Sequence, residues 1–279
     1  MTPALLLLLA ADPAWLRSLE QFRAAREAEL RKPDGWLSVA GLFWLEQGPM
    51  TAGSDPQNRI VLPAPAPARL GSFTLRRSEV LFRADRPGLA TLDGNPVTEA
   101  VLRHHPADLL RIGPLTLFVI KRGDRFALRL RDPNSDMRRN FRGLAWFPPD
   151  AKFRIRGRWI AYAEPKVLSI TNILGQATPT NSPGEAVVSI GFAEYRMNPI
   201  PDVGRLQFVF KDQTSGKQTY GAARFLYVDV PAGKTIELDF NRAENPPCAF
   251  TPYATCPLPP PQNRIRAPIL AGEKDYGKH

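Results

Sequence analysis

The chain has 279 residues, of which 43% are hydrophobic, 23% are charged and 29 are proline. This length is enough for one large hydrophobic core or two modest ones. So many prolines exclude a bundle of long helices, because proline fixes φ and removes a backbone donor. Turn-rich β structure is therefore the expected class.

The formal net charge of +10 raises the question of nucleic-acid binding. Most of the cations are arginines, and many alternate with apolar residues, as at 126–131 and 153–156. This alternation is typical of the solvent-facing side of strands. The sequence contains no motif that enters a nucleic-acid groove. We therefore do not expect nucleic acid as a partner, and the pattern indicates neither a protein partner nor an oligomeric state.

Residues 1–12 have two interpretations. The apolar run from Leu5 to Leu9, followed by two alanines, resembles the end of a signal peptide with a small-residue cleavage site. It could also be the apolar tip of a helix. The run is too short to span a bilayer as a helix. We expect a periplasmic or secreted protein, with a cytoplasmic location as the alternative.

Residues 13–45 are predicted to be a helical segment. Asp12 suits an N-cap and Pro13 the first position of a helix over 13–30, where apolar residues recur at helical spacing. The aromatic-rich stretch that follows is expected to be buried, as a short helix capped by Ser38.

From residue 59 the hydrophobic period changes to two, which predicts strands. Short connections predict antiparallel pairing, because a parallel crossover needs about a dozen residues or more. Strands bounded by Gly, Pro, Asn and Asp are expected at 59–62, 72–75, 80–84, 89–92, 96–101, 109–112, 115–121 and 125–131, and then at 152–162, 166–171, 185–195, 205–211, 218–230 and 235–240.

Two β units follow from this pattern. A polar turn after residue 131 separates a β-sandwich-like unit over 46–131 from a second antiparallel unit over 132–279. The proline-rich tail from Asn245 contains large apolar side chains, so we expect it to be docked on the second unit. The predicted fold class is mostly β, with an antiparallel sandwich or barrel-like architecture, an N-terminal helical segment and a long Pro-rich C-terminal loop.

The tail is the most distinctive part of the sequence. Residues 238–264 closely resemble the signature of the family called domain of unknown function 1684, and shorter matches extend the resemblance over nearly the whole chain. These matches lie at 35–37, 41–45, 53–55, 146–148, 220–221, 224–227 and 271–274. The family implies no established activity.

A partial resemblance covers residues 45–121. The stretches 53–63, 93–97 and 109–113 resemble parts of a forkhead-associated domain, a β-sandwich that grips phosphothreonine from its loops. The gripping residues are missing, because Ser54 stands where an Arg would follow the first Gly and no Ser-x-x-His follows in 65–73. A phosphate would therefore lack its charge-assisted hydrogen bonds. The resemblance implies a β-sandwich scaffold that has lost the ability to bind phosphopeptides.

Cys248 and Cys256 are the two cysteines of the chain. They could form a disulfide in an oxidising compartment, or remain buried thiols in a reducing one. A metal site is poorly supported, because two thiolates need two further ligands and this spacing is not the usual C-x₂₋₄-C. No cofactor and no metal are predicted.

Polar residues beside the tail are the candidate ligand-binding residues. Asp239 and Asn241 would share one face of a strand. A turn at 231–233 would place that strand beside the one before it, which carries further polar side chains. The full set of candidates is Tyr220, Arg224, Asp239, Asn241, Asn245 and Tyr253.

These residues could equally form a structural network that satisfies the backbone carbonyls and amides of the irregular tail. Three functions are compatible with the sequence. The first is a β protein that binds a small ligand or a partner on the polar face under the tail. The second is a hydrolase or lyase with Asp239 as general base, since a carboxylate under an apolar loop can have a raised pKa. The third is a degenerate phosphopeptide-type module. The catalytic residues are otherwise unknown.

Overall fold

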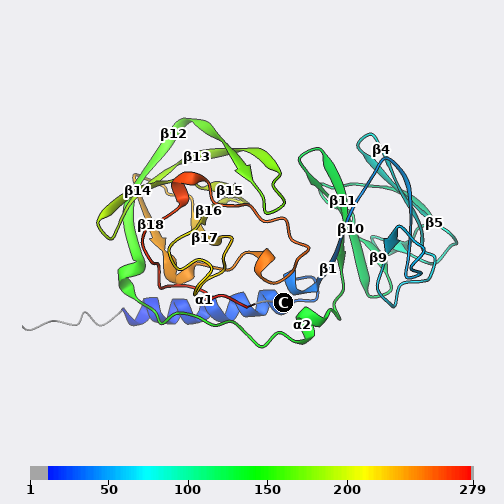
Figure 1. The fold of residues 1–279 in the computed structure, drawn as a ribbon, viewed down its shortest axis with the longest axis horizontal. Coiled ribbons are helices and arrows are strands. Elements are labelled where there is room, and N and C mark those ends of the chain that lie inside the picture. The colour runs from blue at the N-terminus through cyan, green and yellow to red at the C-terminus, as the bar shows by residue number, and fades with distance from the viewer. Residues whose placement is uncertain (1–11, 278–279) are drawn as a thin grey trace, which may run out of the picture.

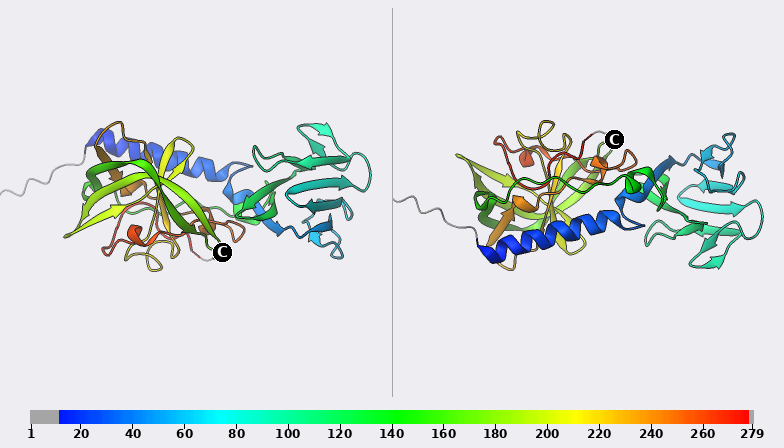
Figure 2. Two further views of the ribbon diagram at one scale, coloured as in Figure 1. Left: turned by 90° about the horizontal axis from the view of Figure 1, so that it is seen from above. Right: turned by 90° about the horizontal axis from the view of Figure 1, so that it is seen from below.

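A computed structural model describes residues 12–277, and the predicted leader at 1–11 lies outside the described residues. The ribbon forms two β lobes, with one long helix lying along the second lobe (Figure 1). Two further views place the same helix against the same lobe (Figure 2). The predicted class is confirmed, because the described chain is mostly antiparallel β structure with an N-terminal helix and no closed barrel.

The predicted N-terminal helix is confirmed as α1 (Pro13–Arg31). The side chain of Asp12 caps it by accepting a hydrogen bond from the backbone N–H of Ala14 at 2.9 Å. Proline at the first position lacks only an N–H that has no partner within a helix anyway. The helix buries three side chains: Trp15, Leu19 and Leu30. No helix among residues 12–277 is long and apolar enough to cross a membrane.

The short helix predicted after Ser38 is wrong. Only one 3₁₀ turn, η1 (Trp36–Ser38), forms, and strand β1 (Val39–Trp44) follows it directly. β1 pairs antiparallel with β11 (Arg125–Arg131), so the sheet ladder supplies the backbone hydrogen bonds that a helix would have made internally. The aromatic run is too short and too close to this sheet edge to form a helix of its own.

The first lobe contains two sheets, with strand orders β1–β11–β10–β9–β6–β7 and β3–β2–β4–β5–β8. A hydrophobic core that includes Phe73 and Phe82 joins them. All strand pairs are antiparallel except β2 with β3. The remaining strands are β2 (Gly48–Gly53), β3 (Ile60–Val61), β4 (Gly71–Arg76), β5 (Glu79–Ala84), β6 (Thr91–Leu92), β7 (Asn95–Pro96), β8 (Glu99–Leu102), β9 (Leu110–Ile112) and β10 (Leu115–Arg122).

The second lobe has its own sheets, with orders β14–β13–β12–β18 and β15–β16–β17. A separate core, which includes Phe208, Phe210 and Phe240, lies in this lobe. Its strands are β12 (Arg154–Thr171), β13 (Ala177–Ile190), β14 (Ala193–Met197), β15 (Ile200–Asp202), β16 (Arg205–Phe210), β17 (Arg224–Asp229) and β18 (Thr235–Asp239).

The segment between the lobes runs back along α1. It begins with the short helix α2 (Asp136–Arg139) and ends at the 3₁₀ turn η2 (Ala151–Phe153). Glu27 of α1 accepts a hydrogen bond from the N–H of Leu144 at 2.8 Å, and Arg23 donates to the carbonyl of Phe147 at 2.9 Å. These bonds fix the link against the helix.

Residues 245–264, which we call the tail, pack onto both lobes. The tail contains the turns η4 (Pro247–Ala249) and η5 (Pro261–Asn263), and the turn η3 (Phe240–Arg242) precedes it. Its side chains Phe250 and Ala254 are almost fully buried. Thr251 donates from its hydroxyl to the carbonyl of Val39 in β1 at 2.9 Å. The long Pro-rich loop is therefore part of the packed structure.

Candidate functional site

The candidate residues from the sequence do not form one site, because the strand pairing that would gather them is wrong. β17 pairs with β16, whereas β18 pairs with β12 along all five of its residues. The strands on either side of residues 231–233 therefore belong to different sheets. Chain proximity is outweighed here by the longer ladder that β12 offers to β18.

Arg224 is a buried structural residue. One of its terminal nitrogens donates to Asp212 at 2.6 Å and to the carbonyl of Ile269 at 3.0 Å, and the other donates to the carbonyl of Ala271 at 2.6 Å. Burial lowers the pKa of Arg224, and the carboxylate of Asp212 acts in the opposite direction. The guanidinium joins β17 to Asp212 and to the C-terminal segment.

Asn241 and Asn245 also bond to backbone groups. Asn241 accepts from the N–H of Asp150 and donates to its carbonyl, both at 2.9 Å. The amide of Asn245 donates to the carbonyl of Lys274 at 2.7 Å. Irregular buried segments need such partners for their peptide groups. Both residues therefore support the loops that they contact.

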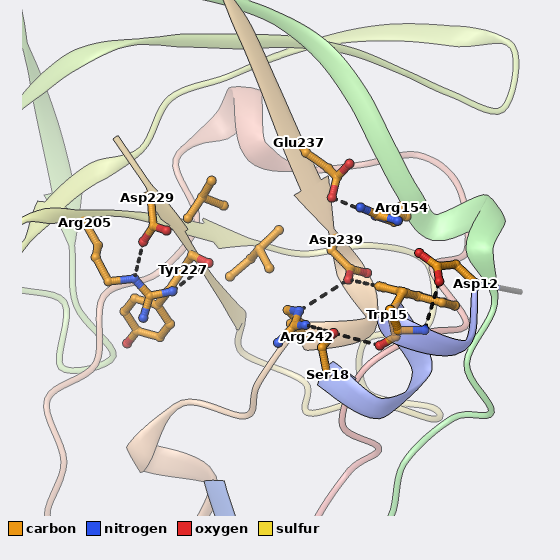
Figure 3. A pocket seen from close by; sticks show the side chains of 13 residues that line it. Asp12, Trp15, Ser18, Arg154, Arg205, Tyr227, Asp229, Glu237, Asp239 and Arg242 are labelled. Atoms are coloured by element: carbon orange, nitrogen blue, oxygen red, sulfur yellow. Dashed lines mark hydrogen bonds and ion pairs between the residues drawn. The ribbon is translucent and has the colours of Figure 1, made fainter. Parts of the chain in front are cut away.

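Asp239 lies in a surface pocket of about 440 Å³ beside the N-terminus of α1 (Figure 3). One carboxylate oxygen accepts a hydrogen bond from the indole N–H of Trp15 at 2.8 Å. The same oxygen is 3.4 Å from the guanidinium of Arg242. The other accepts from the backbone and side-chain amides of Asn241, at 3.1 and 2.9 Å. Both oxygens are thus occupied by bonds that join α1, β18 and η3.

The other charges of this pocket are also matched. Arg154 lies 2.7 Å from Glu237, and Arg205 lies 3.4 Å from Asp229 (Figure 3). Each cation that lines the pocket therefore has a carboxylate partner in the pocket itself. Such an arrangement offers little unpaired charge to a ligand.

Tyr220 and Tyr253 lie at the tail. The hydroxyl of Tyr220 donates to the carbonyl of Cys248 at 3.0 Å. The carbonyl of Tyr253 is 3.4 Å from a terminal nitrogen of Arg129, a residue of β11 in the first lobe. These contacts mark the place where the tail meets both lobes.

A cavity of about 380 Å³, which we call the tail pocket, opens at this place. One wall is the outer face of β15–β17, and the other is the tail. Trp36 and Arg122 of the first lobe complete it. The lining residues are Trp36, Arg122, Asp202, Gln207, Phe225, Tyr227, Pro247, Thr255, Cys256 and Pro257.

Arg122, which lines the tail pocket, and Arg129, a buried neighbour that does not line it, have no carboxylate partner within residues 12–277. Arg122 donates from Nε to the hydroxyl oxygen of Thr255 at 2.8 Å and from one terminal nitrogen to the carbonyl of Lys121 at 2.8 Å. Arg129 is only 4% exposed, stacks at 5.1 Å on the ring of Trp36, and leaves its Nε without a hydrogen bond.

Burial decides the electrostatics of this pair. Burial, and to a smaller extent the positive charge of Arg122, lowers the pKa of Arg129 to about 10. Burial also lowers the pKa of Arg122. An unpaired buried cation is unfavourable, since desolvation is not repaid by a counter-ion.

The two cysteines are free thiols in this structure. The sulfur of Cys256 accepts a hydrogen bond from the backbone N–H of Cys248 at 3.2 Å. A side-chain hydrogen bond with Cys248 and burial raise the pKa of Cys256, and the bond from the backbone N–H of Cys248 acts in the opposite direction. No group of three or more His, Cys, Asp or Glu in the described chain is placed to hold a metal ion. The predicted disulfide stays a prediction.

A second titratable cluster lies beside Tyr227. Arg26 of α1 is 2.9 Å from Glu273 and 3.2 Å from Glu244, so two carboxylates share one guanidinium. Burial raises the pKa of Glu244 to about 7, and the charge of Glu273 contributes. Burial together with the negative charge of Glu244 raises the pKa of Tyr227.

The sequence reading missed Arg122 and Arg129. Arg122 falls between two predicted strands, at a hairpin turn, and Arg129 alternates with apolar residues, which predicts a solvent-facing side of a strand. The tail covers that side at Arg129, from more than one hundred residues away in the sequence, so no local pattern could have found the contact.

The family resemblance is confirmed by comparison with family models. The model of the family described as "Protein of unknown function (DUF1684)" matches residues 139–274, which include α2's last residue, the strands of the second lobe and the tail. No curated protein matches the chain.

Solved structures with similarity to the chain were found as well. The solution NMR structure of an uncharacterized protein from Haloarcula marismortui is 25% identical, with a TM-score of 0.43, over 51% of this chain and 81% of that one. Two forkhead-associated domain structures are each 17% identical. The FhaA domain in complex with the intracellular domain of Rv3910 has a TM-score of 0.24, over 32% of this chain and 97% of that one. The Rv0020c domain has a TM-score of 0.23, over 33% and 94%.

Proposed function

We propose that the protein binds a small anionic ligand with an aromatic or flat apolar part in the tail pocket. The observation that carries the proposal is Arg122, a cation without a carboxylate partner that lines a cavity between two lobes, with a second such cation, Arg129, buried nearby. Ligand sites are typically concave, largely apolar and supplied with a few convergent polar groups, often at domain boundaries.

The apolar part of the ligand would rest on the ring-bearing walls of the pocket. Trp36 of η1 and Phe225 and Tyr227 of β17 line it, and Pro247 and Pro257 add rigid apolar surface. Flat aromatic ligands gain from offset or edge contacts with such rings. The prolines limit the motion of the tail, so the walls need little ordering when the ligand binds.

The anionic group would lie at Arg122. One of its terminal nitrogens makes no hydrogen bond to residues 12–277, and the hydroxyl of Thr255 accepts from Nε and keeps its own proton available. A carboxylate, sulfonate or phosphate could therefore accept charge-assisted bonds from both groups. Asp202 also lines the pocket and would disfavour ligands with more than a small negative charge.

The geometry gives less support to catalysis through Asp239. A general base needs a free oxygen within hydrogen-bond reach of the proton that it removes. One oxygen of Asp239 accepts a hydrogen bond from Trp15, and the other accepts two from Asn241. The bond to Trp15 fixes the start of α1. Phosphopeptide reading also lacks a specific observation in its favour.

The proposal is tested by fluorescence titration with 8-anilinonaphthalene-1-sulfonate, which joins aromatic rings to a sulfonate. We expect saturable binding to the wild type and an affinity that is lower by about tenfold or more in Arg122→Gln, because a charge-assisted bond is lost.

Arg125→Gln is the matched control. Arg125 lies opposite Arg122 in the β10–β11 ladder, but its guanidinium stacks on Trp44 at 4.2 Å. The control removes the same charge from the same hairpin, so its affinity should stay near that of the wild type. Equal weakening in both variants, or unchanged binding in Arg122→Gln, would contradict the proposal. Circular dichroism melting of all three proteins excludes dye binding to unfolded chain.

A further inference from the structure

A second cavity, of about 700 Å³, lies on the far side of the tail and is lined by three cations. Lys211 extends β16, and Arg264 and Arg266 follow the turn η5. Apolar lining comes from Leu258, Pro259 and Ile265. We call Lys211, Arg264 and Arg266 the cation triad.

The backbone forces two members of the triad together. The N–H of Lys211 donates to the carbonyl of Asn263 at 3.2 Å, and the carbonyl of Lys211 accepts from the N–H of Ile265 at 2.7 Å. This parallel bridge places Lys211 directly opposite Arg264. Like charges in that position destabilise a strand pair. The fold therefore holds the positive charges of Lys211 and Arg264 in an electrostatically unfavourable position.

The segment that carries the triad is firmly anchored. The fully buried side chain of Asn263 donates to the carbonyls of Asn198 and Val209, at 2.8 and 2.9 Å. The N–H of Arg266 donates to the hydroxyl of Tyr195 at 3.0 Å. Because the backbone is fixed on both sides of Arg264, the three cations cannot separate by moving the chain.

No counter-charge relieves the triad in the part of the chain that the structure describes. None of its three side chains forms an ion pair with residues 12–277. Asp212 lines the same cavity, but its oxygens bond to Arg224, to Thr214 and to the N–H of Ile269. The side chain of Asp212 is fully buried in that network. The cavity thus carries three unneutralised positive charges.

We propose that the triad binds a phosphorylated small molecule, with the phosphate groups at Lys211, Arg264 and Arg266 and the apolar part against Leu258 and Ile265. Guanidinium and ammonium groups make strong charge-assisted bonds to phosphate oxygens. Nucleic acid is disfavoured as the ligand, because the cations form one compact cluster at a cavity and not a stripe along the surface.

The probe for this site is inorganic pyrophosphate, measured by isothermal titration calorimetry on the full chain at low ionic strength. We expect binding that weakens by about tenfold or more in Arg264→Gln and in Lys211→Gln, because each loses charge-assisted bonds. The control is Arg76→Gln, since Arg76 is an exposed cation at the β4–β5 turn of the first lobe. Its affinity should stay within about twofold of the wild type, because long-range charge is screened.

Two results would overturn the proposal. One is the absence of pyrophosphate binding to the wild type at millimolar concentration. The other is equal weakening in Arg76→Gln, which would show nonspecific attraction to net charge. A single-stranded oligonucleotide serves as competitor, and its tighter binding, weakened in Arg264→Gln and Lys211→Gln but not in Arg76→Gln, would assign the triad to a nucleic-acid backbone instead.

Thermal melting without any anion gives an independent readout. Arg264→Gln should melt at a higher temperature than the wild type, because the substitution removes the repulsion opposite Lys211, and a lower melting temperature would contradict the repulsion argument. Arg122→Gln should bind pyrophosphate as the wild type does, so failure of the tail-pocket proposal and failure of this one are distinguishable.

Discussion

Arg224 in the second lobe and Arg129 at the boundary between the lobes are both buried arginines, but their surroundings differ. Arg224 is fully buried and bonds to a carboxylate and two carbonyls. Arg129 is 4% exposed and has no carboxylate partner within residues 12–277, whereas an unbonded Nε is common to both arginines. A paired buried cation holds a fold together, whereas an unpaired one lowers stability until an anion arrives.

The same contrast separates the two pockets beside Tyr227. The pocket that contains Asp239 is lined by cations that are each matched by a carboxylate (Figure 3). The tail pocket is lined by Arg122, which forms no ion pair with residues 12–277. The unmatched pocket is therefore the better candidate for a ligand, although the matched one contains more charged residues.

The largest expected effect comes from breaking the matched pair in the second lobe. Asp212→Ala should lower the free energy of unfolding by about 3 to 5 kcal/mol, because Arg224 would remain buried without a counter-ion. Urea denaturation measures this change. Asp229→Ala is the control, since its exposed pair with Arg205 should contribute little. Similar losses in both variants would remove the distinction between buried and exposed pairs.

The pH dependence of stability tests the cluster in which two carboxylates share one guanidinium. The pKa of Glu244 is raised to about 7 in the folded protein, so between its ordinary pKa and 7 the folded state binds more protons than the unfolded state. The contribution of Glu244 to the free energy of unfolding is therefore present at low pH and is lost as the pH rises through 7. The loss is at most about 3 kcal/mol.

Urea denaturation at pH 5 and pH 8 measures this loss. Glu244→Gln has no carboxyl group at this position, so its unfolding free energy should change less over the same interval. An equal change in the variant would show that other groups carry the pH dependence, among them Glu273, whose pKa burial also raises.

The state of the cysteines tests whether the tail is fixed covalently. If the chain is exported, as its first residues predict, we expect a Cys248–Cys256 disulfide that adds about 2.5 kcal/mol by the loop-entropy model. Intact mass without reductant should then be two hydrogens lower than with reductant. Equal masses after purification from an oxidising compartment would contradict the disulfide.

The smallest expected effect has the opposite sign. Arg129→Met should raise the free energy of unfolding by about 1 kcal/mol, because it replaces an unpaired buried charge with an apolar side chain of similar length. Thermal or urea unfolding measures the gain. A loss of several kcal/mol would show that the stacking of Arg129 on Trp36 stabilises the boundary and that the cation has a structural role.

The parts of the fold that could be predicted from the sequence are those that depend on local patterns of residues. The cap at Asp12 and the helical spacing after it locate α1, and period-two alternation locates most strands. The tail carries a family signature and large apolar side chains, such as Phe250, which is fully buried. These features need no knowledge of distant partners.

The wrong predictions concern contacts between segments that are far apart in the sequence. β18 pairs with β12, about eighty residues earlier, instead of with its neighbour in sequence, and this moves Asp239 away from Arg224. Arg129 alternates with apolar residues as a solvent-facing residue would, but the tail covers it from more than one hundred residues away. Alternation tells which face a side chain is on and not whether another segment covers that face.

The most direct test of the central claim is native mass spectrometry of the wild type and Arg122→Gln, purified in parallel without added ligand. The account predicts an additional small anionic mass on the wild type that is lost on denaturation and is absent or strongly reduced in the variant, whose melting temperature should stay near that of the wild type. The same additional mass on both proteins, or no additional mass on the wild type even after incubation with an aromatic sulfonate, would contradict a ligand site built on unpaired arginines.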